Sequence, residues 1–573
     1  MRIRHTLAVA VVVAGSFVLR PAPLAQGNAA LSGVVSSQEE GGMEGVVVNA
    51  RRSGAAVTVS VVSDAQGRYE FPRTHLQPGT YALTIRGTGY DLSAPASATV
   101  AAGKPATADL KLQKTKDLAS QLSSTEWAMS IPGTPEQKDA VAFGCTYCHT
   151  IERIVKSRHT AVQWVPVLTR MQTYFLDGTA VHGDRGRFKK NDPEAVANAE
   201  KNPNSLGVTK AAAGEYLASI NMSGGRTSLP YELKTLPRPK GAATRVIMTQ
   251  WDIPRKDTVA HDLAVDAKGR PWYNDQSAMF VGMLDPKTDA FTEYPLPPLP
   301  AGRAGGISDM EFDLDGNLWF PITRAEGHCH FGTPAKFEPA TKKLTLVEVP
   351  NPDDVFGTQN PCGLQFLGRG PDGRIWMNNT QVMVRIDPKT AKIDGTYAFG
   401  RAPNNPPGRR VGYQIVLDSK GNPFISDFGG TSQVIGVDAA TGAVSFWPTP
   451  TKGVQARRGQ MDKQDRYWFA QYRGNQIAMF DTRAKTFREW PVPHKYTSPY
   501  TSSAPDSKGR VYVSSNMSER LLRLDPATSE IIEYLIPTAF DSKKILHDPT
   551  TQRTTLWLNN KRTARVLRVE PLD

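Results

Sequence analysis

Residues 246–573 carry a repeat that constrains the fold more than any other feature of the chain. In each unit an aromatic residue follows a turn, usually one that contains glycine, and successive aromatics are 44 to 57 residues apart. Most units end in a strand that closes on proline, as in Thr292-Glu293-Tyr294-Pro295. A period near 45 residues with four short strands per unit is typical of β-propeller blades. The aromatic positions are Trp272, Trp319, Trp376, Phe424, Trp468, Tyr512 and Trp557.

The two ends of the repeat predict the number of blades. The seventh unit stops at Asp573, where it still lacks an outer strand, and a strand of the missing type stands at the front as residues 249–254. We therefore expect a seven-bladed β-propeller in which this N-terminal strand completes the last blade. Such closure would remove exposed sheet edges.

The blade phrases resemble those of the virginiamycin B (streptogramin) lyase family. The likeness lies in Asp-Leu-Asp-Gly-Asn-Leu-Trp-Phe (313–320) and in Leu-Asp-Pro-Lys-Thr-Asp-Ala-Phe-Thr-Glu-Tyr-Pro-Leu-Pro (284–297). It implies a propeller with a His/Glu constellation and a magnesium ion at its central mouth. The positions after each aromatic pair, where that family often has Thr-Glu, contain no Glu here: they are Asn274-Asp275, Pro321-Ile322, Asn378-Asn379, Ser426-Asp427, Ala470-Gln471, Ser514-Ser515 and Asn559-Asn560.

Polar residues are predicted to line the propeller mouth. His261, Asp262, Asp275 and His547 are the candidates for acid–base chemistry or for binding a divalent cation. A hydrogen-bonded polar mouth without chemistry is the alternative. The residues expected to open the inner strands are His261-Asp262, Ser308-Asp309, Cys362, Tyr413-Gln414, Arg458, Tyr500 and His547-Asp548.

A c-type haem attachment motif lies in a predicted α-helical domain, residues 117–225. Cys145-Thr146-Tyr147-Cys148-His149 matches Cys-x-x-Cys-His, in which two thiols bind the haem vinyl groups and the histidine ligates the iron. A redox dithiol or half of a zinc site are the alternatives. The motif, the helix of residues 161–175 with Trp164 and Met171, and the later Tyr216-Leu217-Ala218 together resemble a small single-haem cytochrome c domain.

The second axial ligand of that haem is less constrained by the sequence. Met171 lies on the same helix face as Trp164, seven residues earlier, and a thioether ligand would raise the reduction potential relative to a second histidine. Packing of Met171 in the core is the alternative. Met222, His159 and His182 are rival ligands, and the polar stretch 177–204 is longer than a minimal cytochrome needs.

Residues 31–113 alternate apolar and polar positions in short runs separated by turn residues. The pattern predicts a small antiparallel β-sandwich. The phrase from Val61 to Pro72, followed by Pro-Gly-Thr-Tyr-Ala-Leu-Thr-Ile and Gly-Thr-Gly-Tyr, resembles the carboxypeptidase regulatory-like (transthyretin-like) domain. The resemblance implies a non-catalytic spacer or binding module.

The first 25 residues resemble a secretory signal peptide. Arg2 and Arg4 precede an apolar stretch, Leu7 to Leu19, which is shorter than a stable membrane-spanning helix requires. An uncleaved N-terminal anchor is the alternative. No later segment is apolar enough to span a membrane, so we expect an exported, periplasmic or extracytoplasmic protein. Residues 226–245 are a Pro-rich linker of intermediate stiffness.

The two remaining cysteines, Cys329 and Cys362, are expected to form a disulfide in an exported protein. Metal ligation by His328 or His330 together with a cysteine is the alternative.

The sequence therefore predicts a multidomain, mostly β protein with one covalent haem c. The leading hypothesis is haem-mediated electron transfer with a redox partner protein, coupled to a small-molecule ligand or partner at the propeller mouth. A lyase-like or hydrolytic propeller with the haem domain as a sensor, and a binding protein, are the alternatives. The formal net charge of +13 suits acidic partners and does not require nucleic acid in an exported protein.

Overall fold

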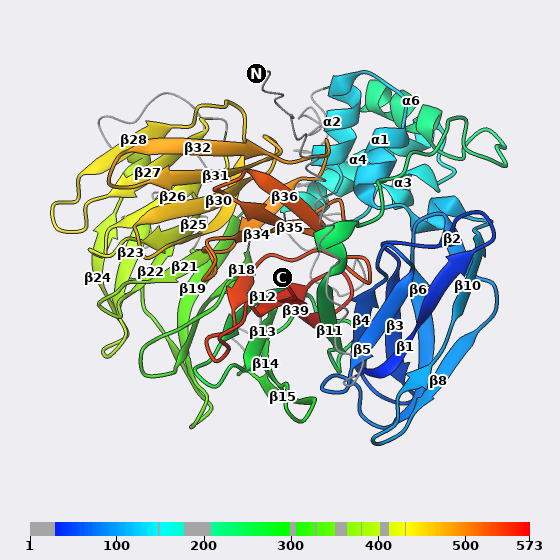
Figure 1. Ribbon diagram of the computed structural model, residues 1–573. Helices are drawn as coiled ribbons and strands as arrows, with labels where there is room; N and C mark the ends of the chain where they lie inside the picture. Colours follow the sequence, from blue (N-terminus) through cyan, green and yellow to red (C-terminus); the bar gives the residue numbers. More distant parts are fainter. Residues whose placement is uncertain are drawn as a thin grey trace, which may run out of the picture.

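The computed structural model describes residues 29–146, 149–176, 208–297, 305–326, 329–349, 364–379, 381–401, 412–429 and 431–573. Strands dominate this part of the chain, and one group of helices lies between two β regions in the sequence. Figure 1 shows the N-terminal strands and the helices side by side along one flank of the larger C-terminal β region. None of the helices in the described residues is long and apolar enough to cross a membrane.

The N-terminal β region is a sandwich of two sheets around one core. Its buried residues include Leu31, Val48, Phe71 and Leu110, at alternating positions of their strands. One sheet contains β1, β2, β5, β7, β9 and β10, and the other contains β3, β4, β6 and β8. The strands are β1 (Ala29–Ser37), β2 (Gly41–Gly42), β3 (Val47–Arg52), β4 (Val57–Val62), β5 (Arg68–Pro72), β6 (Gly79–Arg86), β7 (Tyr90–Leu92), β8 (Ala96–Val100), β9 (Ala106–Thr107) and β10 (Leu110–Lys114).

The helices begin at well-capped N-termini. Ser123 and Thr134 each accept a hydrogen bond from the third residue of the helix that follows, and the side chain of that residue bonds back to the cap. The helix predicted around Trp164 is present and contains Pro166. The elements are η1 (Leu118–Gln121), α1 (Ser124–Ser130), α2 (Pro135–Gly144), α3 (Glu152–Val155), α4 (Ala161–Leu176) and α6 (Lys210–Ile220).

The C-terminal region consists of seven successive groups of antiparallel strands in the described residues, a propeller-like arrangement. One parallel residue pair, Arg458↔Thr501, joins the fifth and sixth groups into a single eight-stranded sheet. The short 3-10 helix η2 (Gly241–Thr244) precedes this region in the sequence. The strands of the first four sheets are β12 (Ala260–Val265), β13 (Pro271–Asp275), β14 (Phe280–Asp285) and β15 (Ala290–Pro295); β16 (Gly305–Ile307), β17 (Glu311–Phe312), β18 (Leu318–Glu326), β19 (Cys329–Glu338) and β20 (Lys343–Leu346); β21 (Phe366–Arg369), β22 (Ile375–Asn378), β23 (Met383–Asp387) and β24 (Lys392–Tyr397); β25 (Gly412–Leu417), β26 (Pro423–Asp427), β27 (Gln433–Val437) and β28 (Val444–Pro448).

The last sheets include the strand that joins the two ends of the repeat. The strands are β29 (Ala456–Met461), β30 (Arg466–Gln471), β31 (Gln476–Asp481) and β32 (Thr486–Pro491); β33 (Pro499–Ser502), β34 (Val511–Ser515), β35 (Arg520–Asp525) and β36 (Glu530–Leu535); β37 (Ile545–His547), β38 (Leu556–Asn560), β39 (Arg565–Pro571) and β11 (Val246–Asp252). β11 pairs with β39 from Val246↔Pro571 to Asp252↔Arg565, which is the pairing predicted for the two ends of the repeat.

One hydrogen bond explains why the turn acid and the aromatic recur together in the repeat. The carboxylate of Asp462 accepts the turn N–H groups of Gln464 and Arg466 and also the indole N–H of Trp468, at 2.8 Å. The same indole–carboxylate bond joins Trp272 to Asp266, Trp319 to Asp313 and Trp557 to Asp548. The acid thus closes the turn and satisfies a largely buried donor at the same time.

The sandwich is joined to the propeller by a continuous sheet. β4 pairs antiparallel with β11 from Ile247↔Val61 to Trp251↔Val57, so the eight strands β37-β38-β39-β11-β4-β3-β6-β8 form one sheet. Arg86 donates to the carbonyl oxygens of Ile536 and Thr538, and His75 contacts Glu570 at 3.0 Å. The module expected to serve as a spacer therefore covers the outer edge of the seventh sheet, which would otherwise expose unpaired backbone groups.

The helices share one hydrophobic core with the propeller. Trp127, Phe143 and Leu217 pack in a single buried cluster with propeller residues, namely Tyr472, Tyr496, Tyr500 and Met517. The hydroxyl of Thr125 donates to the carbonyl oxygen of Tyr496 at 2.8 Å. Because this contact is apolar and buried, it holds the helices firmly against the propeller.

Candidate functional site

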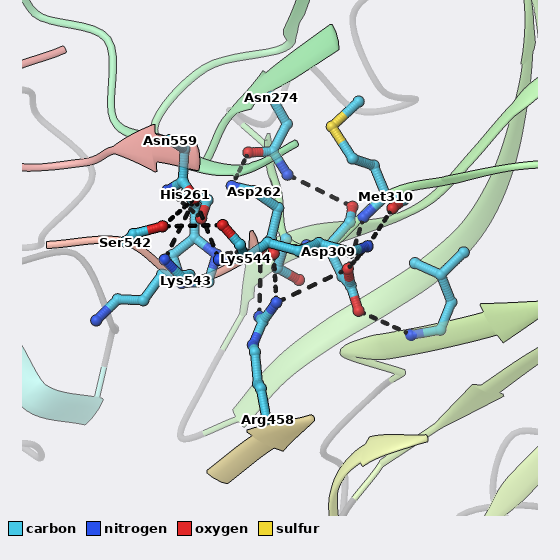
Figure 2. Close-up of polar contacts among 12 residues, drawn as sticks. His261, Asp262, Asn274, Asp309, Met310, Arg458, Ser542, Lys543, Lys544 and Asn559 are labelled. Atoms are coloured by element: carbon cyan, nitrogen blue, oxygen red, sulfur yellow. Dashed lines mark hydrogen bonds and ion pairs between the residues drawn. The ribbon is translucent and has the colours of Figure 1, made fainter. Parts of the chain in front are cut away.

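Five charged or titratable residues from β12, β29 and the segments just before β17 and β37 meet inside the propeller (Figure 2). Arg458 reaches from β29 to Asp262, which follows His261 on β12, and its Nη1 lies 3.8 Å from Asp309. Nδ1 of His261 donates to Asp262 at 2.5 Å. The ammonium group of Lys544 contacts Asp309 at 3.0 Å. We call His261, Asp262, Asp309, Arg458 and Lys544 the central ion cluster.

The charges of the central ion cluster balance one another in the protein interior. The side chains of Asp262, Asp309 and Arg458 are completely buried. Burial alone would raise the pKa of Asp262, but Arg458 and His261 hold it well below its usual value. Burial lowers the pKa of His261 to about 4 although Asp262 opposes the effect, so the imidazole is neutral at pH 7. Two carboxylates are therefore matched by one guanidinium and one ammonium group.

A second group of residues lies beside the central ion cluster and is mainly aromatic. The guanidinium carbon of Arg457 lies 4.9 Å from the ring centre of Tyr413, 4.7 Å from that of Tyr472 and 4.8 Å from that of Tyr500. Nη1 of Arg457 donates to the Tyr413 hydroxyl at 2.6 Å, and this hydroxyl is 2.6 Å from the Tyr500 hydroxyl. We call Arg457, Tyr413, Tyr472 and Tyr500 the tyrosine–arginine cluster.

The tyrosine–arginine cluster touches the Cys-x-x-Cys-His segment. The Tyr472 hydroxyl is 3.4 Å from the hydroxyl of Thr146, which stands between the two cysteines of the motif. The ring of Phe143 meets the ring of Tyr472 edge to face, with centroids 5.6 Å apart. The motif predicted on the helices and the propeller mouth are thus neighbouring parts of one site.

The described residues of the motif have the arrangement that a metal-ligating histidine requires. Cys145 caps the C-terminus of α2, and His149 is half-buried after it. Nδ1 of His149 donates to the carbonyl oxygen of Thr150 at 3.0 Å, which leaves the lone pair on Nε2. Burial lowers the pKa of this imidazole, and the bond to Thr150 opposes the effect only in part. Cys148 lies outside the described residues.

Two tryptophans of the helices have indole N–H groups that lack a protein acceptor. In the described part of the chain neither Trp127 Nε1 nor Trp164 Nε1 has a hydrogen-bond partner, and both atoms are buried. Buried donors normally have an acceptor. Two unsatisfied donors beside the motif fit a segment that folds around a group with acceptor oxygens, such as the carboxylates of a haem.

The structure corrects one predicted mouth residue and explains another. His547 lies at the far end of β37, next to the turn acid Asp548, where its Nε2 contacts the carbonyl oxygen of Ala504 at 2.9 Å. The sequence predicts His547 at the mouth because β37 has only three residues, too few to set the register of the seventh unit. Asp275 does lie at the end of β13, but Arg255, Val259 and Ser277 occupy its oxygens.

Sequence analysis missed four residues of the site, Lys543, Lys544, Arg457 and Tyr472. Lys543-Lys544 immediately precede β37, four positions before His547-Asp548, and a register of the seventh unit shifted by four residues would predict them at the mouth. They diverge: Lys543 points away from the central ion cluster (Figure 2) and contacts Asp541 at 2.7 Å. Tyr472 follows β30, where the sequence carries no signal of its contact with the helices.

Other candidates stay less defined. Met171 and Met222 are half-buried, and His159 is exposed with its ring against Trp164. His182, the 177–204 stretch and Cys362 lie outside the described residues, as does the side chain of Cys329, so their predicted roles remain predictions. Within the described ranges, no three His, Cys, Asp or Glu side chains cluster as a metal site would require.

The neutral state of His261 predicts acid sensitivity. The folded-state pKa lies near 4, below the ordinary value near 6.5, so the unfolded chain binds a proton over this interval while the folded chain does not. The contribution of His261 to the free energy of unfolding is therefore full above about pH 6.5 and decreases as the pH approaches 4. The expected decrease is between about 1 and 3 kcal/mol. Chemical denaturation of wild type and His261→Gln at pH 7, 5.5 and 4.5 measures the difference. Parallel pH dependences in the two proteins would contradict the expectation.

Comparisons with known proteins assign the N-terminal module and find solved structures similar to the C-terminal region. The family model of the carboxypeptidase regulatory-like domain matches residues 30–113. No curated protein matches the chain. Similar solved structures include a catalytically inactive virginiamycin B lyase from Staphylococcus aureus with quinupristin, at 18% identity, TM-score 0.47, and coverage of 57% of this chain and 99% of that one.

Two further solved structures are propeller-like neighbours. A streptogramin B lyase is 16% identical over 58% of this chain and 99% of its own, with a TM-score of 0.47. The extracellular domain of a one-component system from B. thetaiotaomicron is 15% identical over 54% of this chain and 40% of its own, with a TM-score of 0.42. These likenesses concern the fold and assign no chemistry to this chain.

Proposed function

We propose that this chain is an exported c-type cytochrome whose haem-bearing segment is mounted on a propeller mouth. The observation that carries the proposal is the Cys145-x-x-Cys148-His149 motif, with the Nδ1 of His149 engaged by a backbone carbonyl and Nε2 available. The predicted secretory signal in residues 1–25 supports it, because c-type haem is attached outside the cytoplasm.

The residues that would hold the haem come from three parts of the helical segment. Cys145 and Cys148 would supply the thioether links and His149 the proximal nitrogen, and Met171 on α4 is the proposed distal ligand, with Met222, His159 and His182 as its rivals. When bound, haem c supplies a one-electron redox centre. Trp127 and Trp164 contribute buried N–H donors at this segment.

The propeller would hold this redox segment in a fixed position, next to the polar propeller mouth. The shared core of Phe143 with Tyr472 and Tyr496 excludes water from the face that joins them. The mouth lies beside the motif. A ligand or a partner protein that binds there would therefore be close to the haem with which it exchanges an electron. The net charge of +13 favours encounter with an acidic redox partner.

The proposal is tested with the full chain, produced in a host whose c-type assembly machinery is active. We expect one haem per chain that resists acid–acetone extraction and that shows the spectrum of a two-thioether haem as its pyridine complex. Chain that matures in this host without covalent haem would overturn the proposal.

One observation favours a second candidate function, acid–base chemistry at the mouth. Asp262 holds Nδ1–H of the neutral His261, which leaves Nε2 as a proton acceptor, as a general base requires. A screen of ester, lactone and cyclic depsipeptide substrates with wild type and His261→Gln tests it. Activity that is equal in the two proteins would exclude His261 as the base.

A further inference from the structure

The turn between β38 and β39 carries a cation and a hydroxyl group that lack partners. Arg562 is half-buried, and its guanidinium makes no hydrogen bond or ion pair in the described part of the chain. Its Nε is buried, and so is the hydroxyl oxygen of Thr563, which has no hydrogen-bond partner among the described residues either. Because buried donors normally have an acceptor, this turn offers two donors that a bound group could satisfy.

Asn560 fixes this turn beside the segment that carries Asp541. Its Oδ1 accepts the backbone N–H of Arg562 at 3.1 Å and the backbone N–H of Asp541 at 3.3 Å. The backbone N–H of Lys561 donates to the carbonyl oxygen of Asp541 at 3.0 Å. The position of the turn is therefore set by the fold, so a ligand that binds there does not have to order it.

One buried carboxylate lies among two cations at this place. Asp541 is 4% exposed, and its Oδ1 contacts Nζ of Lys543, which is also 4% exposed, at 2.7 Å. Burial would raise the pKa of Asp541, but the charges of Lys543 and then Arg562 help to hold it at about 2. Asp541 is thus ionised and already paired with Lys543, while Arg562 acts on it from outside ion-pair distance. The three side chains together carry one positive charge in excess.

A planar guanidinium with free donors is suited to an oxyanion. It can donate two parallel N–H bonds to a carboxylate or a phosphate, and such charge-assisted bonds are stronger than those between neutral groups. Partial burial strengthens the attraction, because the effective dielectric constant is lower there than in bulk water. The remaining exposure of Arg562 leaves the group open to a ligand from solution.

We infer that the turn of residues 561–563 binds one small oxyanion, a carboxylate or a phosphate, through the guanidinium of Arg562, with the hydroxyl of Thr563 as a second donor. The inference goes beyond the proposed function, because the site consists of propeller residues and involves no haem. Lys543 and Lys544 are consecutive, so the site borders the central ion cluster. An anionic small molecule at the propeller mouth would be anchored here by its charged group.

The test is equilibrium dialysis of the full chain against radiolabelled inorganic phosphate in one arm and radiolabelled acetate in the other, at constant ionic strength. We expect one saturable site per chain, and the arm with the tighter binding identifies the oxyanion. Arg562→Gln should weaken binding at least about tenfold, and Arg562→Lys, which keeps the charge but not the planar pair of donors, should fall between the two. Arg565→Gln is the matched control from the same hairpin, because Asp252 already occupies Arg565 at 2.6 Å, and it should bind like wild type.

Two results would overturn the inference: folded wild type without saturable binding in either arm, or Arg562→Gln with wild-type affinity. The haem content of the same wild-type preparation tests the proposed function separately, so the two can fail independently. If Arg562→Gln does not fold, phenylglyoxal labelling of wild type replaces it. The bound anion should protect Arg562 but not the exposed Arg553, and equal labelling of Arg562 with and without the anion would contradict the site.

Discussion

Replacing Cys145 and Cys148 together by alanine is expected to abolish covalent haem, from one per chain to none. Thioether formation consumes both thiols, and the described helices provide no second Cys-x-x-Cys-His segment. The single replacements should each retain at most one thioether, and the pyridine complex should then absorb at longer wavelength because one vinyl group stays unsaturated. Haem stain after denaturing electrophoresis and the pyridine spectrum measure both effects.

The other two cysteines provide a matched control. Cys329→Ala and Cys362→Ala remove the same number of thiols from the same chain but lie outside the motif. They should leave haem attachment at the wild-type level. Loss of haem in this control, or full retention in the Cys145/Cys148 double variant, would show that attachment does not depend on the motif.

Replacing Asp262 by alanine should destabilise the propeller by about 3–5 kcal/mol, because it leaves the guanidinium of Arg458 buried without its principal counter-charge. The Asp262 carboxylate also accepts a hydrogen bond from the backbone N–H of Asp309 at 3.1 Å. The replacement therefore also removes a hydrogen bond between the first and second blades. Denaturant unfolding followed by tryptophan fluorescence measures the change, and six fully buried tryptophans in the described chain make the signal large.

A double-variant cycle distinguishes the charge effect from a packing effect. In Asp262→Ala with Arg458→Met, both members of the pair are gone while Lys544 still matches Asp309 at 3.0 Å. This double variant should be less destabilised than Asp262→Ala alone, since no unpaired charge stays buried. If the two single effects simply add, the ion pair is not the reason for the loss.

Several local features were predictable because they depend on short-range chemistry. The turn acid Asp462 and Trp468 are six residues apart, so their hydrogen bond is set by the local sequence, and an equivalent bond occurs in three further units. Capping of α2 by Thr134 is equally local. The seventh unit was less predictable, because its inner strand is only Ile545–His547 and a three-residue strand has too little pattern to set its register. The structure therefore places His547 at the end of β37 away from the mouth, where it contacts the carbonyl oxygen of Ala504.

The sequence by itself determined the Cys-x-x-Cys-His motif, the sandwich, the repeat of seven units and the pairing of its two ends, with the closing strand predicted at residues 249–254 and observed at 246–252. Each of these features depends on residues that are close together or recur at a fixed period. The tertiary structure alone decided which distant parts of the chain contact one another. It joined β4 to β11 in one sheet, brought Arg458 from β29 to Asp262 on β12, and set Tyr472 against Thr146. Such contacts depend on how separate surfaces pack, and a burial pattern records that a residue is covered but not which distant residue covers it.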